Sequence, residues 1–286
     1  MLNKNTKHII PALCFAGSLM NLAGCSTPST PQKSKASLVF EEKCKLSIPK
    51  IYKKIENVDG VLLLKIRPKN TNNESVTKDR YTPHAAMILE SGDDLYIKSF
   101  LEREYEQGGG KFSSGDRGKV HYIPPDMNPN SLRSKPGFKY ADYINPSTHE
   151  HYRYTVSTEI IGKKDTSLPG IKMGMAAKKD FDLNIYKEVL HKDIVTAPAP
   201  RYAITYEDHV IEDERRLGIA SSTLKVIDTK TNEPLGEYTV YAIGAGFDQT
   251  NHYDSWLSSE ACPSRYNRDI SARTRLFATD VLIPSE

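Results

Sequence analysis

Two histidines one residue apart, His149 and His151, form the arrangement in this sequence best suited to metal chemistry. On a β-strand, residues two apart project from the same face, so both imidazoles could bind one metal ion. The sequence offers no third ligand. A His-Glu-x-x-His zinc motif is excluded because Tyr152 and Arg153 stand where the second histidine would have to follow. A polar strand start is the simpler interpretation, and a metal-binding protein or enzyme built on His149 and His151 stays open as an alternative.

Motifs for nucleophilic or phosphoryl-transfer chemistry are incomplete. Two segments fit Ser-x-x-Lys, at 75–78 and 222–225, but neither has the Ser-Asp-Asn or Lys-Thr-Gly partner that such chemistry uses. No Gly-x-Ser-x-Gly elbow occurs. The segment 110–116 has the glycine spacing of a phosphate-binding loop, yet Asp116 stands where the lysine is required. We therefore predict that the protein is not an enzyme, and that it carries neither a cofactor nor a metal ion.

Two clusters of side chains are better suited to binding another protein. A tyrosine-rich stretch includes Tyr140 and Tyr143, and tyrosine is a frequent interface anchor because it combines an apolar ring with a hydroxyl group. An acidic stretch, 207–214, precedes Arg215 and Arg216; it is explained most simply as a solvated helix face, with an acidic contact surface as the alternative. The candidate partner-binding residues are Tyr140, Tyr143, Glu207, Asp208, Glu212 and Asp213.

The first 25 residues contain the parts of a secretory signal in the expected order. Lys4 and Lys7 precede an apolar run at 9–22, which is too short to span a bilayer. The run ends in Leu-Ala-Gly-Cys, which resembles the bacterial lipobox and implies removal of residues 1–24 and lipidation of Cys25. Because Ser26 follows the cysteine, where Asp would be needed to retain the protein, the resemblance also implies an outer-membrane anchor facing the periplasm.

The remaining cysteines predict a disulfide. Residues 25–37 form a Ser/Pro/Lys-rich tether with little to bury, and a single globular domain is expected over 38–286. Once Cys14 leaves with the signal and Cys25 carries lipid, Cys44 and Cys262 are left in an oxidising compartment. An even pair of cysteines in such a compartment usually forms a bridge. Two separate buried thiols are the alternative.

The body of the chain indicates an α+β, β-rich domain with a mainly antiparallel sheet, few short helices and long polar loops. Strands are expected at 61–66, 84–89, 95–99, 151–161, 201–206, 222–228 and 236–243. The last two flank a polar turn and form the clearest hairpin, and a second hairpin is expected around Ser91-Gly92-Asp93-Asp94. Helices are expected at 100–105, 180–190 and 207–217.

Composition excludes several classes of protein. The 286 residues are 38% hydrophobic and 26% charged, which excludes collagen-like, coiled-coil and fully disordered chains. No later segment approaches the length of a transmembrane helix. The formal net charge of +3 indicates no general attraction to nucleic acid.

Several segments together resemble one group of bacterial proteins. The segments are 57–64, 202–208, 212–216, 218–233, Trp256 and Ala261-Cys262-Pro263. They are similar to the immunity lipoproteins that accompany phospholipase effectors of type VI secretion in Gram-negative bacteria. The resemblance implies that the protein binds a cognate secreted lipase in the periplasm and blocks it by stoichiometric contact. An envelope-assembly or structural scaffold lipoprotein is the alternative of a different class, and a periplasmic metal protein using His149 and His151 is the third.

Overall fold

The structure is a computed structural model that describes residues 33–69, 77–106, 119–120, 134–245, 247, 255–263, 266 and 269–286. The chain divides into one unit of residues 1–33 and one compact unit of residues 34–286. The expected signal peptide and the lipidated Cys25 lie outside the described residues.

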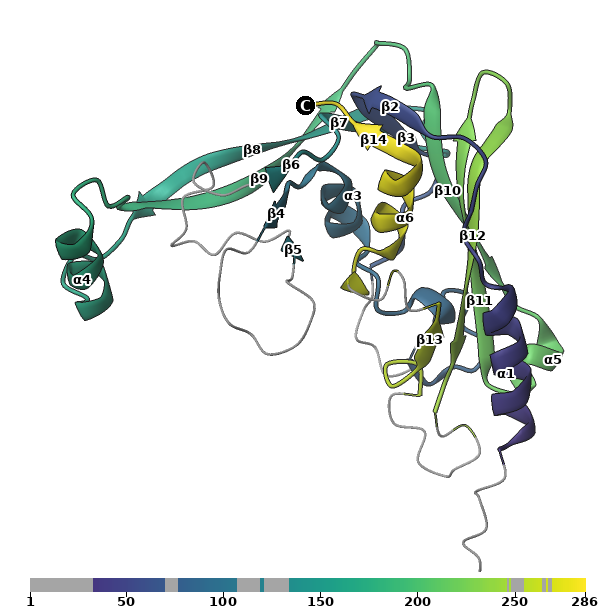
Figure 1. Ribbon diagram of the computed structural model, residues 1–286. Coiled ribbons are helices and arrows are strands. Elements are labelled where there is room, and N and C mark those ends of the chain that lie inside the picture. The colour runs from purple at the N-terminus through teal and green to yellow at the C-terminus, as the bar shows by residue number, and fades with distance from the viewer. Residues whose placement is uncertain are drawn as a thin grey trace, which may run out of the picture. The chain divides into compact units, whose positions relative to one another are not determined.

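A nine-stranded mixed sheet is the main feature of the fold (Figure 1). Eight strands follow the order β1-β12-β11-β10-β3-β7-β8-β9, and β13 pairs with β12. β3 runs parallel to both of its neighbours, whereas the other pairs are antiparallel. The expected α+β class with a mainly antiparallel sheet is therefore confirmed, with a parallel centre that was not foreseen. The bounds are β1 Lys50–Ile51, β3 Gly60–Leu63, β7 Tyr140–Ile144, β8 His151–Lys163, β9 Asn184–Ile194, β10 Tyr202–His209, β11 Ile219–Asp228, β12 Glu233–Ile243 and β13 Glu260–Cys262.

Two small sheets and several short helices complete the described part of the chain. β2 (Ile55–Val58) pairs with β14 (Leu282–Pro284), and β4 (Glu104–Glu106) lies between β5 (Lys119–Val120) and β6 (Ser134–Lys135). The helices are α1 Lys35–Leu46, the 3-10 turn η1 Ala85–Met87, α3 Asp93–Leu101, α4 Pro169–Ala177, α5 Glu212–Arg216 and α6 Arg273–Val281. Ser34 caps the N-terminus of α1, and its hydroxyl accepts the Ser37 N–H at 3.1 Å.

The hydrophobic core lies on one face of the large sheet. Strands β10, β11 and β12 send alternate side chains to this face, where η1 and α6 pack on β11 and β12 and α3 packs on β7 and β8. Tyr96 of α3 meets Tyr206 edge to face with ring centroids 6.5 Å apart, and Phe277 of α6 lies 5.5 Å from Tyr238. Aromatic burial on this scale contributes several kcal/mol of hydrophobic stabilisation, roughly 25 cal/mol for each Å² of apolar surface.

The strands expected in the middle and near the end of the chain are confirmed, whereas the prediction of one hairpin is wrong. The β11–β12 hairpin, β8, β10 and β3 form at or close to the expected positions, although β3 ends at Leu63 and not at residue 66. The expected hairpin at 84–99 is instead η1 followed by α3. Asp93 and Asp94 occupy the first turn of α3, where carboxylates interact favourably with the helix dipole. A short apolar run does not by its pattern distinguish a buried strand from a buried helix, which explains the error.

The three expected helices are also corrected. Residues 184–194 form β9, because they pair along nearly their whole length with β8. The segment 207–217 divides into the end of β10 and the short helix α5, and 100–105 divides into the end of α3 and the start of β4. In each case pairing with a distant strand decides the conformation, and local pattern does not contain that information.

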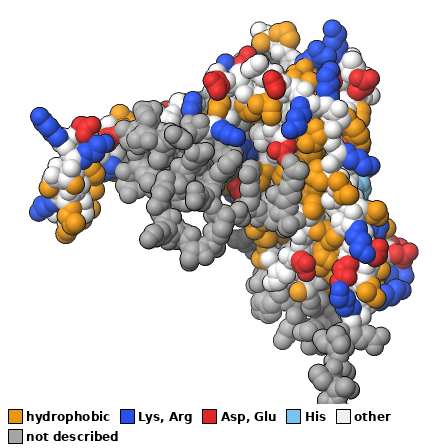
Figure 2. Space-filling view, in the orientation of Figure 1, with side chains coloured by type: hydrophobic (Ala, Val, Ile, Leu, Met, Phe, Trp, Pro, Cys, Tyr) orange, Lys and Arg blue, Asp and Glu red, His pale blue; other side chains and the backbone are white. Residues whose placement is uncertain are grey.

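Strands β8 and β9 form a two-stranded arm that carries α4 at its end (Figure 1). We call β8, β9 and the connecting residues 164–183 the arm. Its base packs against α3, and its far half is exposed from Thr158 onward. In Figure 2 hydrophobic and basic side chains gather at the end of the arm, on the left of the view.

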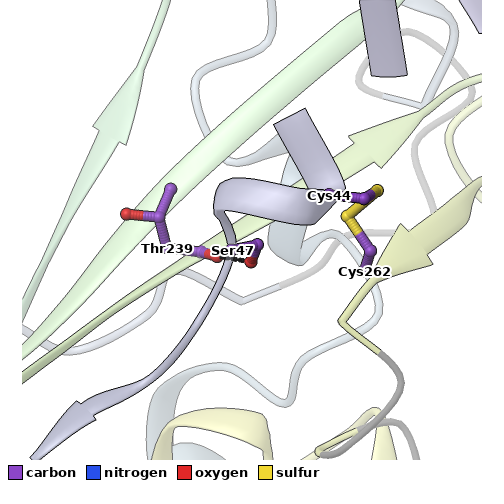
Figure 3. The surroundings of a disulfide bond; sticks show 4 residues. All are labelled: Cys44, Ser47, Thr239 and Cys262. Carbon is purple, nitrogen blue, oxygen red and sulfur yellow. Dashed lines mark hydrogen bonds between the residues drawn. A yellow bond between two sulfur atoms is a disulfide. The ribbon is translucent and has the colours of Figure 1, made fainter. Parts of the chain in front are cut away.

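Cys44 of α1 and Cys262 of β13 are joined by a disulfide, as expected (Figure 3). Their Cα atoms are 5.6 Å apart, although 218 residues separate them in sequence. Near the end of α1, the Ser47 hydroxyl donates to the carbonyl of Thr239 in β12 (Figure 3). The bridge therefore fastens the first helix to the edge of the sheet that β12 and β13 form.

Candidate functional site

The face of the large sheet opposite α3 and α6 is the candidate functional site, and we call it the open face. Register places Tyr140 and Asp142 of β7 on this face together with His151 and Arg153 of β8 and Glu207 of β10. Exposure agrees with the register, because the Glu207 side chain remains 60% exposed. Ile144, on the same face, is 40% exposed. The α1 helix contacts this side of the sheet at β12.

A buried carboxylate organises the centre of the open face. Asp142 is fully buried and accepts two hydrogen bonds from Arg153, from Nε at 2.8 Å and from Nη2 at 2.9 Å. The Nε2 atom of His151 lies 2.8 Å from the same carboxylate. The hydrogen bond to Asp142 raises the pKa of the Arg153 guanidinium above its ordinary value. The paired arrangement compensates for the cost of burying the carboxylate and fixes Arg153 against the sheet.

Tyr140 lies between this arginine and a glycine. The Arg153 guanidinium carbon is 3.9 Å from the centre of the Tyr140 ring, which is a cation–π contact. On the neighbouring strand β3, Gly60 leaves the space that the ring occupies: a Cβ atom at position 60 would lie 2.2 Å from Tyr140 Cε2. The ring can therefore lie flat on the sheet because residue 60 has no side chain.

We expect Gly60→Ala to destabilise the protein by about 1–3 kcal/mol, because the new methyl group forces the Tyr140 ring off the sheet. Gly170→Ala is the matched control, since a Cβ at position 170 meets nothing within 4 Å. Urea unfolding of both variants checks the expectation. Equal midpoints for the two variants would contradict this account of Tyr140.

A polar strip continues the open face across β10, β11 and β12. Glu207 lies 3.6 Å from Lys225, and His209 Nε2 lies 2.8 Å from the Thr223 hydroxyl, which in turn is 3.0 Å from Thr239. These groups are partly solvated, so the ion pair is a weak contributor to stability. The strip offers donors and acceptors on a rigid sheet, which is the arrangement that a protein interface can use.

A serine, a histidine and a glutamate meet on the arm without forming a catalytic triad. Ser157 Oγ lies 2.6 Å from His191 Nε2, and Glu159 Oε1 lies 3.7 Å from that same nitrogen. In a triad the acid must bind the other ring nitrogen, so that the histidine can take the serine proton. The cluster was not visible in the sequence because the β8–β9 register brings together residues 34 positions apart.

His149 and His151 do not share a strand face. His149 lies in the turn before β8 with φ of 60°, and its N–H donates to the Asn145 carbonyl at 2.8 Å. His151 begins β8 and points to Asp142. Within the described ranges, no group of three His, Cys, Asp or Glu side chains is placed to hold a metal ion. The two-ligand geometry expected for a strand is therefore corrected.

The remaining candidate residues divide between three places. Tyr143 lies on the core face of β7, where it packs against the hydrophobic cluster. Asp208 also points inward and accepts hydrogen bonds from Arg67 at 2.7 Å and Ser222 at 2.7 Å. Glu212 and Asp213 are exposed in the first turn of α5, beyond the end of β10. Of the six candidates, Tyr140 and Glu207 therefore lie on the open face, on two strands that β3 separates.

Asp208 belongs to a buried polar network whose role is structural. Arg67 is 2% exposed and donates to Glu90 at 2.9 Å and to Ser222 at 3.0 Å, while its guanidinium lies 3.5 Å from the Tyr206 ring centre. Burial raises the pKa of the Tyr206 hydroxyl to about 12 and also raises the pKa of the Glu90 carboxyl. Because water has little access to Arg67 and Glu90, the network stabilises the fold, and a substrate could not reach it.

Comparison with known proteins found no match: no protein-family model, no curated protein and no solved structure matches the chain. Among the described residues, no helix has the length and apolar character needed to cross a membrane.

Proposed function

We propose that this protein is a periplasm-facing immunity lipoprotein that binds a cognate type VI secreted phospholipase and blocks it by stoichiometric contact. The observation that carries the proposal is the open face, a partly exposed sheet surface that contains the Asp142–Arg153 ion pair and at whose β12–β13 edge the disulfide fastens α1. The sequence segments that resemble immunity lipoproteins support the choice of partner, because two of them include Gly60 of β3 and Glu207 of β10.

Anchoring at Cys25 forms part of the proposal. A phospholipase acts at the bilayer surface, so an inhibitor held in the outer membrane by its lipid would be concentrated where the enzyme works. Because α1 begins at Lys35 and Ser34 caps it, the tether is shorter than the expected 25–37: the eight residues 26–33, STPSTPQK, give the binding domain a reach of up to about 28 Å. Inhibition by binding requires a complementary surface and no reaction by the inhibitor itself.

The proposed contact predicts a defined effect for one charge reversal. Glu207→Arg should weaken binding of the lipase by about tenfold or more, because Glu207 is the most exposed of the open-face residues described above. Glu56→Arg is the matched control, since Glu56 is an exposed glutamate in β2, which belongs to a different sheet.

Cells that produce the lipase in the periplasm, together with each full-length variant, provide the test. When the three proteins are produced at equal and limiting levels, wild type and Glu56→Arg should rescue growth, and Glu207→Arg should rescue it less well. Full rescue by all three proteins would exclude Glu207 from the contact. Failure of the wild type to rescue growth from any lipase that it captures would overturn the proposed function.

A further inference from the structure

The end of the arm is a folded element with its own packing, and we call residues 160–181 the arm tip. The Phe181 ring packs against Gly174 of α4, where a Cβ atom would lie 2.4 Å from the ring, and the Lys164 ammonium lies 5.1 Å from its centre. The Asp165 carboxylate accepts the Ser167 N–H at 2.8 Å and so organises the turn before α4. The chain therefore holds α4 in a fixed position at the end of the arm.

Apolar side chains at the arm tip face solvent to an unusual extent. Met173 is 73% exposed, Ile160 and Ile161 are 59% and 57% exposed, and Leu168 is 52% exposed. No residue of α4 is buried. Ile171 and Met175 are half-buried on the side of α4 toward Phe181, which leaves Lys172 and Met173 directed outward. Exposed apolar side chains gathered in one place mark an interaction site more often than scattered ones do.

Basic side chains surround these apolar ones. The arm tip contains five lysines and two carboxylates, Asp165 and Asp180, so its formal charge is +3. Lys164 is buried against Phe181, whereas Lys163, Lys172, Lys178 and Lys179 are exposed. The last three form no ion pair with any carboxylate in the part of the chain that the structure describes. The arm tip thus combines a local positive charge with projecting aliphatic side chains, although the whole protein is close to neutral.

We propose that the arm tip docks on an anionic phospholipid surface. Aliphatic side chains enter the boundary between headgroups and acyl chains, and the lysines meet the negative phosphates. A protein partner is less well matched, because lysine is depleted at the centres of protein interfaces. The inference rests on the arm alone and holds independently of any lipase that the open face binds. It gives the protein a second, reversible contact with the bilayer that would fix its orientation there.

Fluorescence quenching by brominated lipid tests the docking with the full lipidated chain in vesicles. The natural tryptophan, Trp256, is fully buried, so Met173→Trp adds the one emission that brominated acyl chains can reach at the arm tip. Lys230→Trp is the control, since Lys230 lies exposed in the turn between β11 and β12. The vesicles contain brominated phosphatidylcholine alone or mixed in equal parts with phosphatidylglycerol.

The added emission of Met173→Trp should fall by about half in the anionic vesicles and much less in the neutral ones. Replacing Lys172, Lys178 and Lys179 by glutamine should lower the docking equilibrium by about a hundredfold, or about fivefold for each lysine, and abolish the quenching. High salt should also weaken the docking of the arm tip, because it screens the attraction between the lysines and the anionic lipids. Quenching no greater than that of Lys230→Trp would overturn the proposal, and so would equal quenching in both kinds of vesicle. A change in the Met173→Trp emission that appears only when a lipase is added would also overturn it.

Discussion

Replacing Cys44 and Cys262 together by serine should lower the free energy of unfolding by up to about 5 kcal/mol. The bridge closes a loop with a sequence separation of 218 residues, and the chain-entropy model gives a large stabilisation for a loop of that length. Without the bridge, the unfolded chain gains conformational freedom, and α1 keeps a smaller set of contacts with the sheet, including the Ser47 hydrogen bond to Thr239. Few single features of a domain contribute as much.

Urea unfolding of the mature protein with and without reductant provides the measurement. The wild type should lose stability when reduced and then match the double-serine variant, whose midpoint should not respond to reductant. If the two proteins unfold at the same urea concentration under oxidising conditions, the bridge contributes little and this part of the account is wrong.

Arg67→Met should destabilise the protein by about 3–5 kcal/mol at neutral pH. The substitution removes the charge that compensates the buried Glu90, to which Thr274 also donates from its N–H at 2.6 Å and its hydroxyl at 2.8 Å. Adding Glu90→Gln should recover most of the loss, because a neutral amide can still accept the Thr274 hydrogen bond. Arg201→Met is the control: Arg201 also binds a carboxylate, that of Asp228, but its side chain is 49% exposed, and its loss should be much smaller.

The same variant should show a characteristic pH dependence. Burial raises the pKa of the Glu90 carboxyl, and the charge of Arg67 opposes that rise, so Arg67→Met should raise this pKa further. A carboxyl with a raised folded-state pKa binds its proton more tightly when folded than the unfolded value of about 4.3 allows. The deficit relative to wild type should therefore be largest above the folded-state pKa and shrink as the pH falls through it. A deficit that does not change with pH would contradict the assignment to Glu90.

Sequence alone predicted the parts of the fold that depend on local pattern. The pattern of 222–228 and 236–243 around a polar turn predicted the β11–β12 hairpin, and the cysteine count predicted the bridge. Prediction from sequence failed where a partner elsewhere in the chain decides the conformation. Residues 184–194 are a strand because β8 pairs with them. The α3 segment is a helix because Tyr96, Ile97 and Phe100 bury one side of it against the sheet. The sequence also contains no sign of the parallel pairing of β3.

The candidate site was predictable to a similar degree. Tyr140 and Glu207 were identified by residue type, and both lie on the open face. Asp208, adjacent to Glu207, faces inward because side chains alternate along a strand, and the sequence does not show which of the two is exposed. Asp142 and Arg153 were not identified, since their pairing depends on the β7–β8 register. Gly60 could be recognised as important only once the Tyr140 ring was placed.

Titration of the cognate lipase with the purified protein tests the central proposal, protection by stoichiometric binding, most directly. A periplasmic inhibitor of this kind needs a dissociation constant near or below 1 nM, about −12 kcal/mol, and an interface of roughly 1,600 Å². Lipase activity should fall linearly to zero at about one inhibitor per enzyme, and denaturation followed by refolding should return an active, unmodified lipase. Inhibition at far below equimolar amounts, or recovery of a cleaved or covalently altered lipase, would contradict the account and indicate an enzyme.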